Sequence, residues 1–154
     1  MVLRMNKKEI IWLAGFIDGE GYIGITSQRK KENRQQSASV HYHPYLIITN
    51  SNLNILKEIK KVVGFGHIYK LSQDIKNHKH AFQYKLTEME KLSMLLPILQ
   101  PYLRLKQRQC GLLVNFINTR KNAKRIYGPF RGATSYTIEE DIYQKLLILN
   151  KRGL

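Results

Sequence analysis

The chain has 154 residues, enough for one domain with a single hydrophobic core. Hydrophobic residues make up 43% of it and charged residues 24%, a balance that argues against disorder. Its 26 lysines and arginines against 11 aspartates and glutamates give a formal net charge of +15, so the chain attracts polyanions. Nucleic acid is the first partner that this charge predicts, and an anionic membrane surface is the second.

The sequence carries no sign of a disulfide framework, a zinc site or a membrane segment. Cys110 is the only cysteine, and the apolar helical pattern around it predicts a buried side chain rather than a nucleophile. Its five histidines lack thiol or carboxylate companions at metal-binding spacing. No apolar run is long enough to span a membrane, no signal peptide is seen, and no helix pattern sets basic residues opposite an apolar face. We therefore expect an intracellular protein, in an organelle or in a bacterial or archaeal cytoplasm.

Hydrophobic periodicity predicts helices and strands in the order α-β-β-α-β-β-α, followed by further helices. In chain order they are a helix over 7–18, strands over 22–28 and 37–50, a helix over 52–63, strands over 67–71 and 81–86, a helix from Thr87 to Pro97 or Pro101, a helix over 106–119 and a last helix from Thr137 to Asn150. Two hairpins with helices on one face of a four-stranded antiparallel sheet make an α+β fold, in which the other face is free.

The helix ends are predicted from capping residues and breakers. Ser51 is expected to cap the second helix. Thr87 with Glu90, and Thr137 with Glu140, have the spacing of capping boxes. Glycines at 19 and 21 and at 64 and 66, and the prolines at 97 and 101, are expected to end helices.

Alternating side chains predict that the sheet has one oily and one polar face. In 81–86, for example, Phe82, Tyr84 and Leu86 point one way, while Gln83 and Lys85 point the other. A two-stranded ribbon with such polar groups fits the major groove of DNA. Solvated strand faces would look the same, and the net charge favours DNA. The residues predicted to contact DNA are Thr26, Gln28, Lys30, Arg34, His41, His43, Tyr69, Gln83 and Lys85.

Residues 12–22 read WLAGFIDGEGY, and 99–107 read LQPYLRLKQ. The first resembles the LAGLIDADG signature, and the second resembles the LQPFLKLKQ segment of the same family of homing endonucleases. The resemblance covers roughly 7–118 and points to the single-motif, homodimeric branch known from group I introns. It implies the homing-endonuclease fold, with a saddle-like sheet, in a single domain over 1–154. Its core would cover about 7–119, with a C-terminal helical extension over about 135–151.

The motif also has a physical interpretation of its own. Ala14 and Gly15 are followed four residues later by Asp18 and Gly19, so small residues form a stripe that lets two helices approach closely. Two such helices about a two-fold axis bring together the two carboxylates of Glu20. Like charges at that point require a cation, and hard oxygen ligands select Mg²⁺. The predicted dimer interface comprises Trp12, Leu13, Ala14, Gly15, Phe16, Asp18 and Gly19.

The resemblance implies roles for further residues. Glu20 takes the metal-binding acidic position, with the backbone carbonyl of Gly19 as a second ligand, whereas Asp18 braces the helices. Lys106 matches a basic residue near the scissile phosphate. Asn50 stands where the family often has Gln, which orders the nucleophilic water. Asn54 departs from a basic position, and the groups that could replace that charge are Arg104 and Arg108.

The implied activity is site-specific cleavage of both strands of a long pseudo-palindromic DNA, leaving 3′ overhangs and promoting intron homing. Mg²⁺ is the expected cofactor; we expect Mn²⁺ to substitute, and Ca²⁺ to support binding without efficient cleavage. One motif supplies one acidic ligand, so two active sites require a homodimer. Two alternatives remain: an RNA maturase that assists splicing of its host intron, and a cleavage-inactive DNA-binding protein. The intact Glu20 and Lys106 favour the nuclease.

Overall fold

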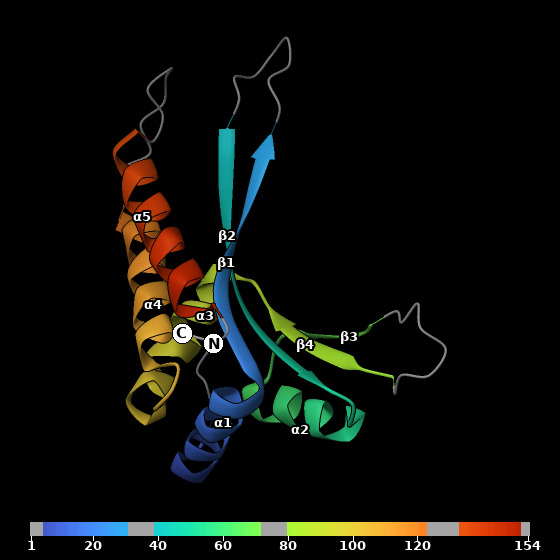
Figure 1. The fold of residues 1–154 in the computed structure, drawn as a ribbon. Helices are drawn as coiled ribbons and strands as arrows, with labels where there is room; N and C mark the ends of the chain where they lie inside the picture. The colour runs from blue at the N-terminus through green and yellow to red at the C-terminus, as the bar shows by residue number, and fades with distance from the viewer. Residues whose placement is uncertain (1–4, 31–38, 72–79, 123–132, 152–154) are drawn as a thin grey trace.

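The computed structural model describes residues 5–30, 39–71, 80–122 and 133–151, without the side chains of 30, 39 and 133–136. Within these residues, ten elements follow one another (Figure 1). They are α1 (Lys7–Glu20), β1 (Gly21–Lys30), β2 (Ser39–Asn50), α2 (Leu53–Val63), β3 (His67–Lys70), β4 (Phe82–Leu86), α3 (Met89–Leu99), the 3₁₀ turn η1 (Gln100–Tyr102), α4 (Gln107–Asn122) and α5 (Ala133–Leu149). The predicted order and the α+β class are confirmed.

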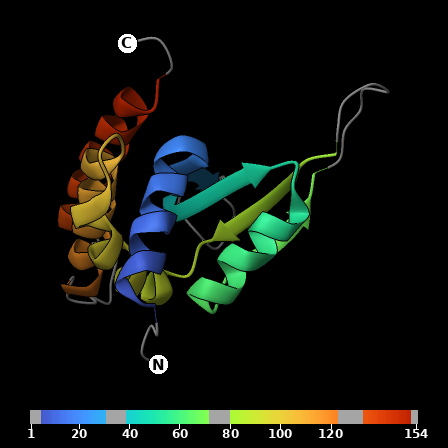
Figure 2. The same cartoon turned by 90° about the horizontal axis from the view of Figure 1, so that it is seen from below.

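The four strands form one antiparallel sheet in the order β1-β2-β4-β3. The β1–β2 hairpin is long, with Gly21 opposite Ile48 at one end and Lys30 opposite Ser39 at the other. Strand β4 pairs only with the last part of β2, so the hairpin extends beyond the other two strands (Figure 1). Helices α1 and α2 lie side by side on one face of the sheet (Figure 2). None of the described helices covers the opposite, concave face.

The core lies between the helices and the oily face of the sheet. Burial alternates with a period of two in β2 from Tyr42 to Ile48 and in β4 from Tyr84 to Leu86, as predicted, and the helices bury one stripe each. The strand residues in the core are Ile23, Ile25, Tyr42, Leu46, Ile48, Tyr84 and Leu86. The residues of α1, α2 and α3 packed against them are Leu13, Ala14, Ile17, Leu56, Ile59, Val63, Leu92, Leu95, Leu96 and Leu99.

Helix α5 packs against α4 and the edge strand β1, and so belongs to the same core. Arg120 of α4 holds Glu139 of α5 with two charge-assisted hydrogen bonds of 2.8 and 3.0 Å, and Glu139 is buried. At the other end of α5, the Asn150 side chain donates to the backbone carbonyl of Ile23 at 2.9 Å. This contact satisfies an acceptor of the sheet edge.

Helix α1 extends further than predicted at its C-terminal end. It runs through Gly19 and Glu20, so the expectation that Gly19 ends it is wrong. Gly21 ends it instead: its N–H bonds to the carbonyl of Ile17, and its backbone is extended, with φ of −85°. A Cβ on Gly21 would lie 2.7 Å from that same carbonyl oxygen, so only glycine fits where the helix turns into β1. At the other end, the Asn6 side chain starts α1, in a capping box with Glu9 that sequence reasoning missed.

Three predicted helix starts are wrong. Asn52, rather than Ser51, caps α2, accepting from the N–H groups of its first turn at 3.0 and 3.4 Å. Helix α3 begins after Glu88 with no side-chain cap, so Thr87 does not act as one. Thr137 lies inside α5, which begins at Ala133, so it does not start that helix. Glu140, its partner in the suspected capping box, accepts a hydrogen bond from Tyr42 in the sheet.

The glycines after α2 end their helix as predicted, whereas a proline in α3 does not. Gly64 and Gly66 end α2 as predicted, with positive φ of 84° and 93°. Of the two prolines expected to end α3, Pro97 lies inside it, two residues before the last one, Leu99, so that expectation is wrong for Pro97. Pro101 follows the end of α3 and lies in the turn η1, as expected. The missing N–H of Pro97 costs one helical hydrogen bond, and the full burial of Leu95, Leu96 and Leu99 on the same helix offsets that loss.

The burial of Cys110 generates a prediction about its reactivity. Its thiol contacts the carbonyl of Leu96 at 3.4 Å, and burial raises its pKa to about 12. At pH 8 the folded protein should therefore react with a thiol reagent more than about a thousandfold more slowly than the unfolded chain, whose thiol has a pKa of about 8.5. Colorimetric labelling with and without urea measures this ratio. Rapid labelling of the folded protein would contradict the placement of Cys110 in the core.

Candidate active site and nucleic-acid interface

Asp18 joins the end of α1 to the start of α4. Its carboxylate accepts hydrogen bonds from three backbone N–H groups: 2.7 Å from Arg104, 3.2 Å from Leu105 and 2.9 Å from Lys106. These are the amides that precede α4, where the helix dipole favours a negative charge. We call this set of three hydrogen bonds the Asp18 clamp. Asp18 is half-buried and its carboxylate is used within the protomer, whereas the sequence placed it in the dimer interface.

Lys106 lies against the last turn of α1. Its ammonium donates to the backbone carbonyl of Asp18, and α1 has no basic residue in its own last turn. The lysine therefore brings a positive charge to the negative end of the helix dipole. Burial lowers the pKa of Lys106, while the negative charges of Asp18 and Glu20 oppose that shift. Lys106 and Glu20 thus share one electrostatic environment, and the catalytic roles that the resemblance implies for them remain predictions.

Glu20 is the last residue of α1, and its side chain is exposed. No described residue makes a hydrogen bond or ion pair to its carboxylate. The carbonyls of the final turn, including that of Gly19, lack helical partners at the same end. A carboxylate and a backbone carbonyl are an all-oxygen donor set, which fits Mg²⁺ or Ca²⁺. Within the described part of one chain, no cluster of three or more His, Cys, Asp or Glu residues could hold a metal by itself.

Asn50 is the last residue of β2, two positions beyond Ile48, the strand partner of Gly21. This places Asn50 at the end of the sheet where α1 ends. Its side-chain oxygen accepts from the N–H of Asn52 at 2.8 Å and so supports the start of α2. With its oxygen used in this way, Asn50 could bond to the reacting water through its NH₂ group. That role remains a prediction. Asn54 is exposed in the first turn of α2, and the alternative cations Arg104 and Arg108 are exposed next to Lys106.

The predicted dimer residues on α1 divide between two sides of the helix. Leu13 and Ala14 are 1% and 0% exposed in the protomer's own core, which corrects the prediction that their side chains meet a second copy. The outward side carries Gly15 and Gly19, where an added Cβ would meet no atom within 4 Å. Ile11 on the same side is 48% exposed. Trp12 and Phe16 are half-exposed beside it, with ring centroids 5.9 Å apart.

The residues predicted to contact DNA lie together on the concave face of the sheet. Cross-strand pairing sets Thr26 opposite His43, Gln28 opposite His41, and Tyr69 opposite Gln83. The seven whose side chains the structure describes are Thr26, Gln28, His41, His43, Tyr69, Gln83 and Lys85. Lys30 has the same alternation in β1, and Arg34 lies outside the described residues. Contact with DNA itself remains a prediction.

Sequence reasoning missed further members of this face, including His67, which lies opposite Lys85 on β3. Tyr22, Tyr45, Ile47 and Thr49 share the alternation of their strands with the predicted residues, so the period of two could have identified them. The side chain of Gln83 donates to the hydroxyl of Thr49 at 3.4 Å. Polar and aromatic groups therefore continue across the face to the end of β2 beside Glu20.

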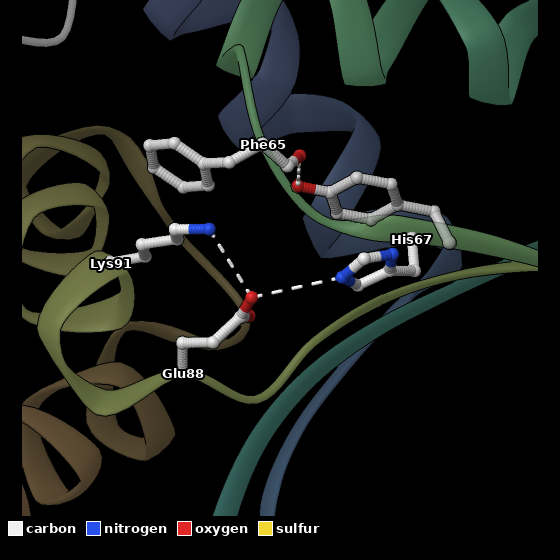
Figure 3. A network of polar contacts seen from close by, with 5 residues as sticks. Phe65, His67, Glu88 and Lys91 are labelled. Atoms are coloured by element: carbon white, nitrogen blue, oxygen red, sulfur yellow. Dashed lines mark hydrogen bonds and ion pairs between the residues drawn. The ribbon is translucent and has the colours of Figure 1, made fainter.

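A separate polar network, centred on Glu88, holds the start of β3 against α3 (Figure 3). The carboxylate of Glu88 lies 3.2 Å from Lys91 and 3.8 Å from His67. The hydrogen bond from its own backbone N–H lowers the pKa of Glu88; burial opposes this effect, and Lys91 lowers the pKa further. Tyr84 donates to the carbonyl of Phe65 at 2.9 Å. These contacts pair the acid with structural partners, so we assign Glu88 no catalytic role.

The sequence model of the LAGLIDADG endonuclease family matches residues 13–119, from the middle of α1 to α4. The chain belongs to this family. DNA endonuclease I-CreI of Chlamydomonas reinhardtii is 27% identical to this LAGLIDADG endonuclease over 124 residues, which are 80% of the chain and 71% of the relative.

Solved structures of homing endonucleases share the fold. I-CvuI in complex with the I-CreI target aligns with a TM-score of 0.70 and 20% identity, over 96% of this chain and 85% of that one. The archaeal intron-encoded I-Vdi141I, complexed with DNA, aligns with a TM-score of 0.74 and 18% identity, over 96% and 87%. The resemblance inferred from the motif and the saddle-like fold are therefore confirmed. No helix in the described part of the chain is long and apolar enough to cross a membrane.

The Asp18 clamp predicts a large loss of stability on substitution. Asp18→Ala removes the acceptor of three amide hydrogen bonds and should lower the free energy of unfolding by about 3 kcal/mol, since bonds to charged groups contribute more than neutral ones. Urea unfolding followed by circular dichroism measures the change.

The matched control is Asp141→Ala. Asp141 is an exposed carboxylate of α5 that pairs with Lys145 at 2.7 Å, and its loss should change stability by less than about 0.5 kcal/mol. Equal effects of the two substitutions would contradict the clamp.

Proposed function

We propose that this LAGLIDADG endonuclease is a homing endonuclease that binds a long pseudo-palindromic DNA as a homodimer and hydrolyses both strands, leaving 3′ overhangs. The observation that carries the proposal is the position of Glu20: an exposed carboxylate at the end of the motif helix, beside Lys106, at the inner end of an open polar sheet face. Cleavage at such a site would initiate transfer of a host intron.

The concave face supplies the DNA-binding surface. It is open in the described residues, it is wide enough to present two hairpins, and it carries amide, imidazole, hydroxyl and ammonium groups. Such side chains read base edges in the major groove. The net charge of +15 attracts the phosphate backbone and favours binding independently of sequence. The structures of I-CvuI and I-Vdi141I are complexes with DNA, which supports the same partner here.

Two copies are needed because one chain offers one motif carboxylate. The outward side of α1, with Gly15 and Gly19 bare and Ile11 exposed, lets a second α1 approach closely about a two-fold axis. That arrangement places both copies of Glu20 near the axis and turns the two concave faces toward one duplex. It also makes the target a pseudo-palindrome.

At each site the Glu20 carboxylate and the Gly19 carbonyl would hold Mg²⁺. A divalent cation there supplies a Lewis acid for the phosphate and an activated water. The ammonium of Lys106 donates to a phosphate oxygen and stabilises the charge that develops in the transition state. The NH₂ group of Asn50 orients the attacking water. Complexes of I-CvuI with DNA in the presence of Mg or Ca support a divalent ion, and we expect Mn²⁺ to replace Mg²⁺, with Ca²⁺ allowing binding only.

Removing the acidic oxygen should separate cleavage from binding. Glu20→Gln keeps the size of the side chain but loses the negative charge that holds the cation. The rate of cleavage in Mg²⁺ should fall by about a thousandfold or more, while the dissociation constant for the same duplex stays within about threefold. Gel analysis of end-labelled duplex and fluorescence anisotropy give the two values.

Glu58→Gln is the control for this substitution, since Glu58 is an exposed carboxylate on α2, away from the end of α1. It should cleave at the rate of the unmodified protein. A Glu20→Gln variant that still cut at that rate would contradict the proposed site.

The proposed dimer predicts that Gly15→Ala weakens association of the two copies. In a solvated helix, Gly15→Ala would stabilise the protein by up to about 1 kcal/mol. Against a second α1, the added methyl group forces the two backbones apart and should raise the dissociation constant of the dimer about tenfold or more. Analytical ultracentrifugation measures that constant. Asn115→Ala, at an exposed position of α4, is the control and should leave association unchanged.

A further inference from the structure

An apolar patch interrupts the polar residues of the concave face. It consists of Tyr22 and Gly24 on β1 and of Tyr45 and Ile47 on β2, and we call it the tyrosine patch. The register sets Tyr22 opposite Ile47 and Gly24 opposite Tyr45, so the four positions form two adjacent cross-strand pairs. The next pair outward is polar, with Thr26 opposite His43.

The two rings of the patch pack closely against each other and against the backbone of β1. Tyr22 and Tyr45 stack with centroids 5.8 Å apart and an angle of only 7° between the ring planes. A Cβ on Gly24 would lie 2.6 Å from the hydroxyl oxygen of Tyr45 and 2.9 Å from its ring, so the glycine makes room for this ring. Burial, and then the neighbouring Tyr22, raise the pKa of Tyr45 well above its usual value, so the ring is uncharged.

Covering a strand glycine with a cross-strand aromatic ring is a known way to stabilise a sheet. That role accounts for Tyr45 but not for Tyr22, which remains 41% exposed on the same face. The stack therefore presents an apolar surface outward, toward whatever occupies the concave face.

The position of the patch along the strands sets which part of a bound DNA it faces. Tyr22 follows Glu20 by two residues, whereas Thr26 and Gln28 lie further out on β1. A strand rises about 3.3 Å per residue, close to the spacing of base pairs, so a step outward along β1 is a step outward along the target. In a dimer built on α1, the tyrosine patch faces the inner positions that the sheet contacts, and the polar pairs face the outer ones.

We propose that the tyrosine patch makes the protein specific for thymine at these inner positions, through apolar contact with the 5-methyl group. The inference rests on the proposed function and names which base one part of the site selects. In the major groove, the thymine methyl is the only apolar group that a base pair offers. The other base edges present hydrogen-bond donors and acceptors. Burying these against Ile47 and the tyrosine rings would remove their water without supplying a hydrogen-bond partner, which costs free energy.

Deleting single methyl groups from the DNA tests this with the unmodified protein. Binding sites are first selected from a randomised duplex library by the full chain in Ca²⁺, and each thymine of the selected site is then replaced by uracil. Uracil at an inner position should raise the dissociation constant about fourfold, as expected for one buried methyl group. Fluorescence anisotropy measures each constant.

Two variants then assign the effect to the patch. In Tyr22→Ser and in Tyr45→Ser, the ratio of the dissociation constants for uracil and thymine at that position should fall to about one. Thr26→Ala, on the next cross-strand pair, is the matched control and should keep the fourfold ratio. A ratio that stays at four in both tyrosine variants would overturn the assignment.

The outcomes separate this inference from the proposed function. If no sequence is selected from the library, the proposed function fails and the inference fails with it. If a site is selected but has no thymine at its inner positions, or if its inner methyl groups can be removed without effect, the inference alone is overturned. A selected site with methyl-sensitive inner thymines, lost in the tyrosine variants, supports both.

Discussion

The site depends on two reciprocal contacts between the C-terminal end of α1 and the turn that precedes α4. Asp18 gives its carboxylate to three amides at the positive end of α4, and Lys106, from that same turn, gives its ammonium to the carbonyl of Asp18 at the negative end of α1. Each helix end thus receives the charge that its dipole favours. Asp18 lies two residues before Glu20, and Lys106 contacts the same turn of the helix. The two contacts therefore fix the Glu20 carboxylate and the Lys106 ammonium relative to each other before any DNA is bound.

The fold then gives one sheet two separate tasks. Its oily face packs against α1, α2 and α3, and α5 completes the core along the free edge of β1. Its concave face keeps the polar and aromatic groups, and β1 leads onto that face directly from Glu20 through Gly21. The strand that presents the side chains proposed to read bases is therefore continuous with the helix that carries Glu20, so the proposed binding and cleavage sites share one rigid connection.

Much of this could be predicted from the sequence, and the errors have physical causes. The period of two and the LAGLIDADG motif predicted the sheet, its two faces and the position of Glu20. Local capping rules failed at Ser51, where the neighbouring Asn52 caps α2, and at Thr87, because α3 starts without a side-chain cap. They failed also at Thr137, which lies inside α5 and whose suspected partner Glu140 bonds to Tyr42 across the fold. The role of Asp18 in capping α4 could not be predicted, since its partners lie 86 to 88 residues away in the chain. The burial of Leu13 and Ala14 likewise depends on how α1 packs, whereas spacing alone groups Ala14 with Gly15.

The central claim is that two copies of the chain, each with one Glu20, cut the two strands of a symmetric site. Sequencing of the DNA ends produced from a randomised duplex library in Mg²⁺ tests it most directly. The account predicts breaks at a pseudo-palindromic sequence, at positions related by its two-fold axis and staggered to leave 3′ overhangs. Breaks at sequences without such symmetry, or selective binding with no breaks at all, would contradict it.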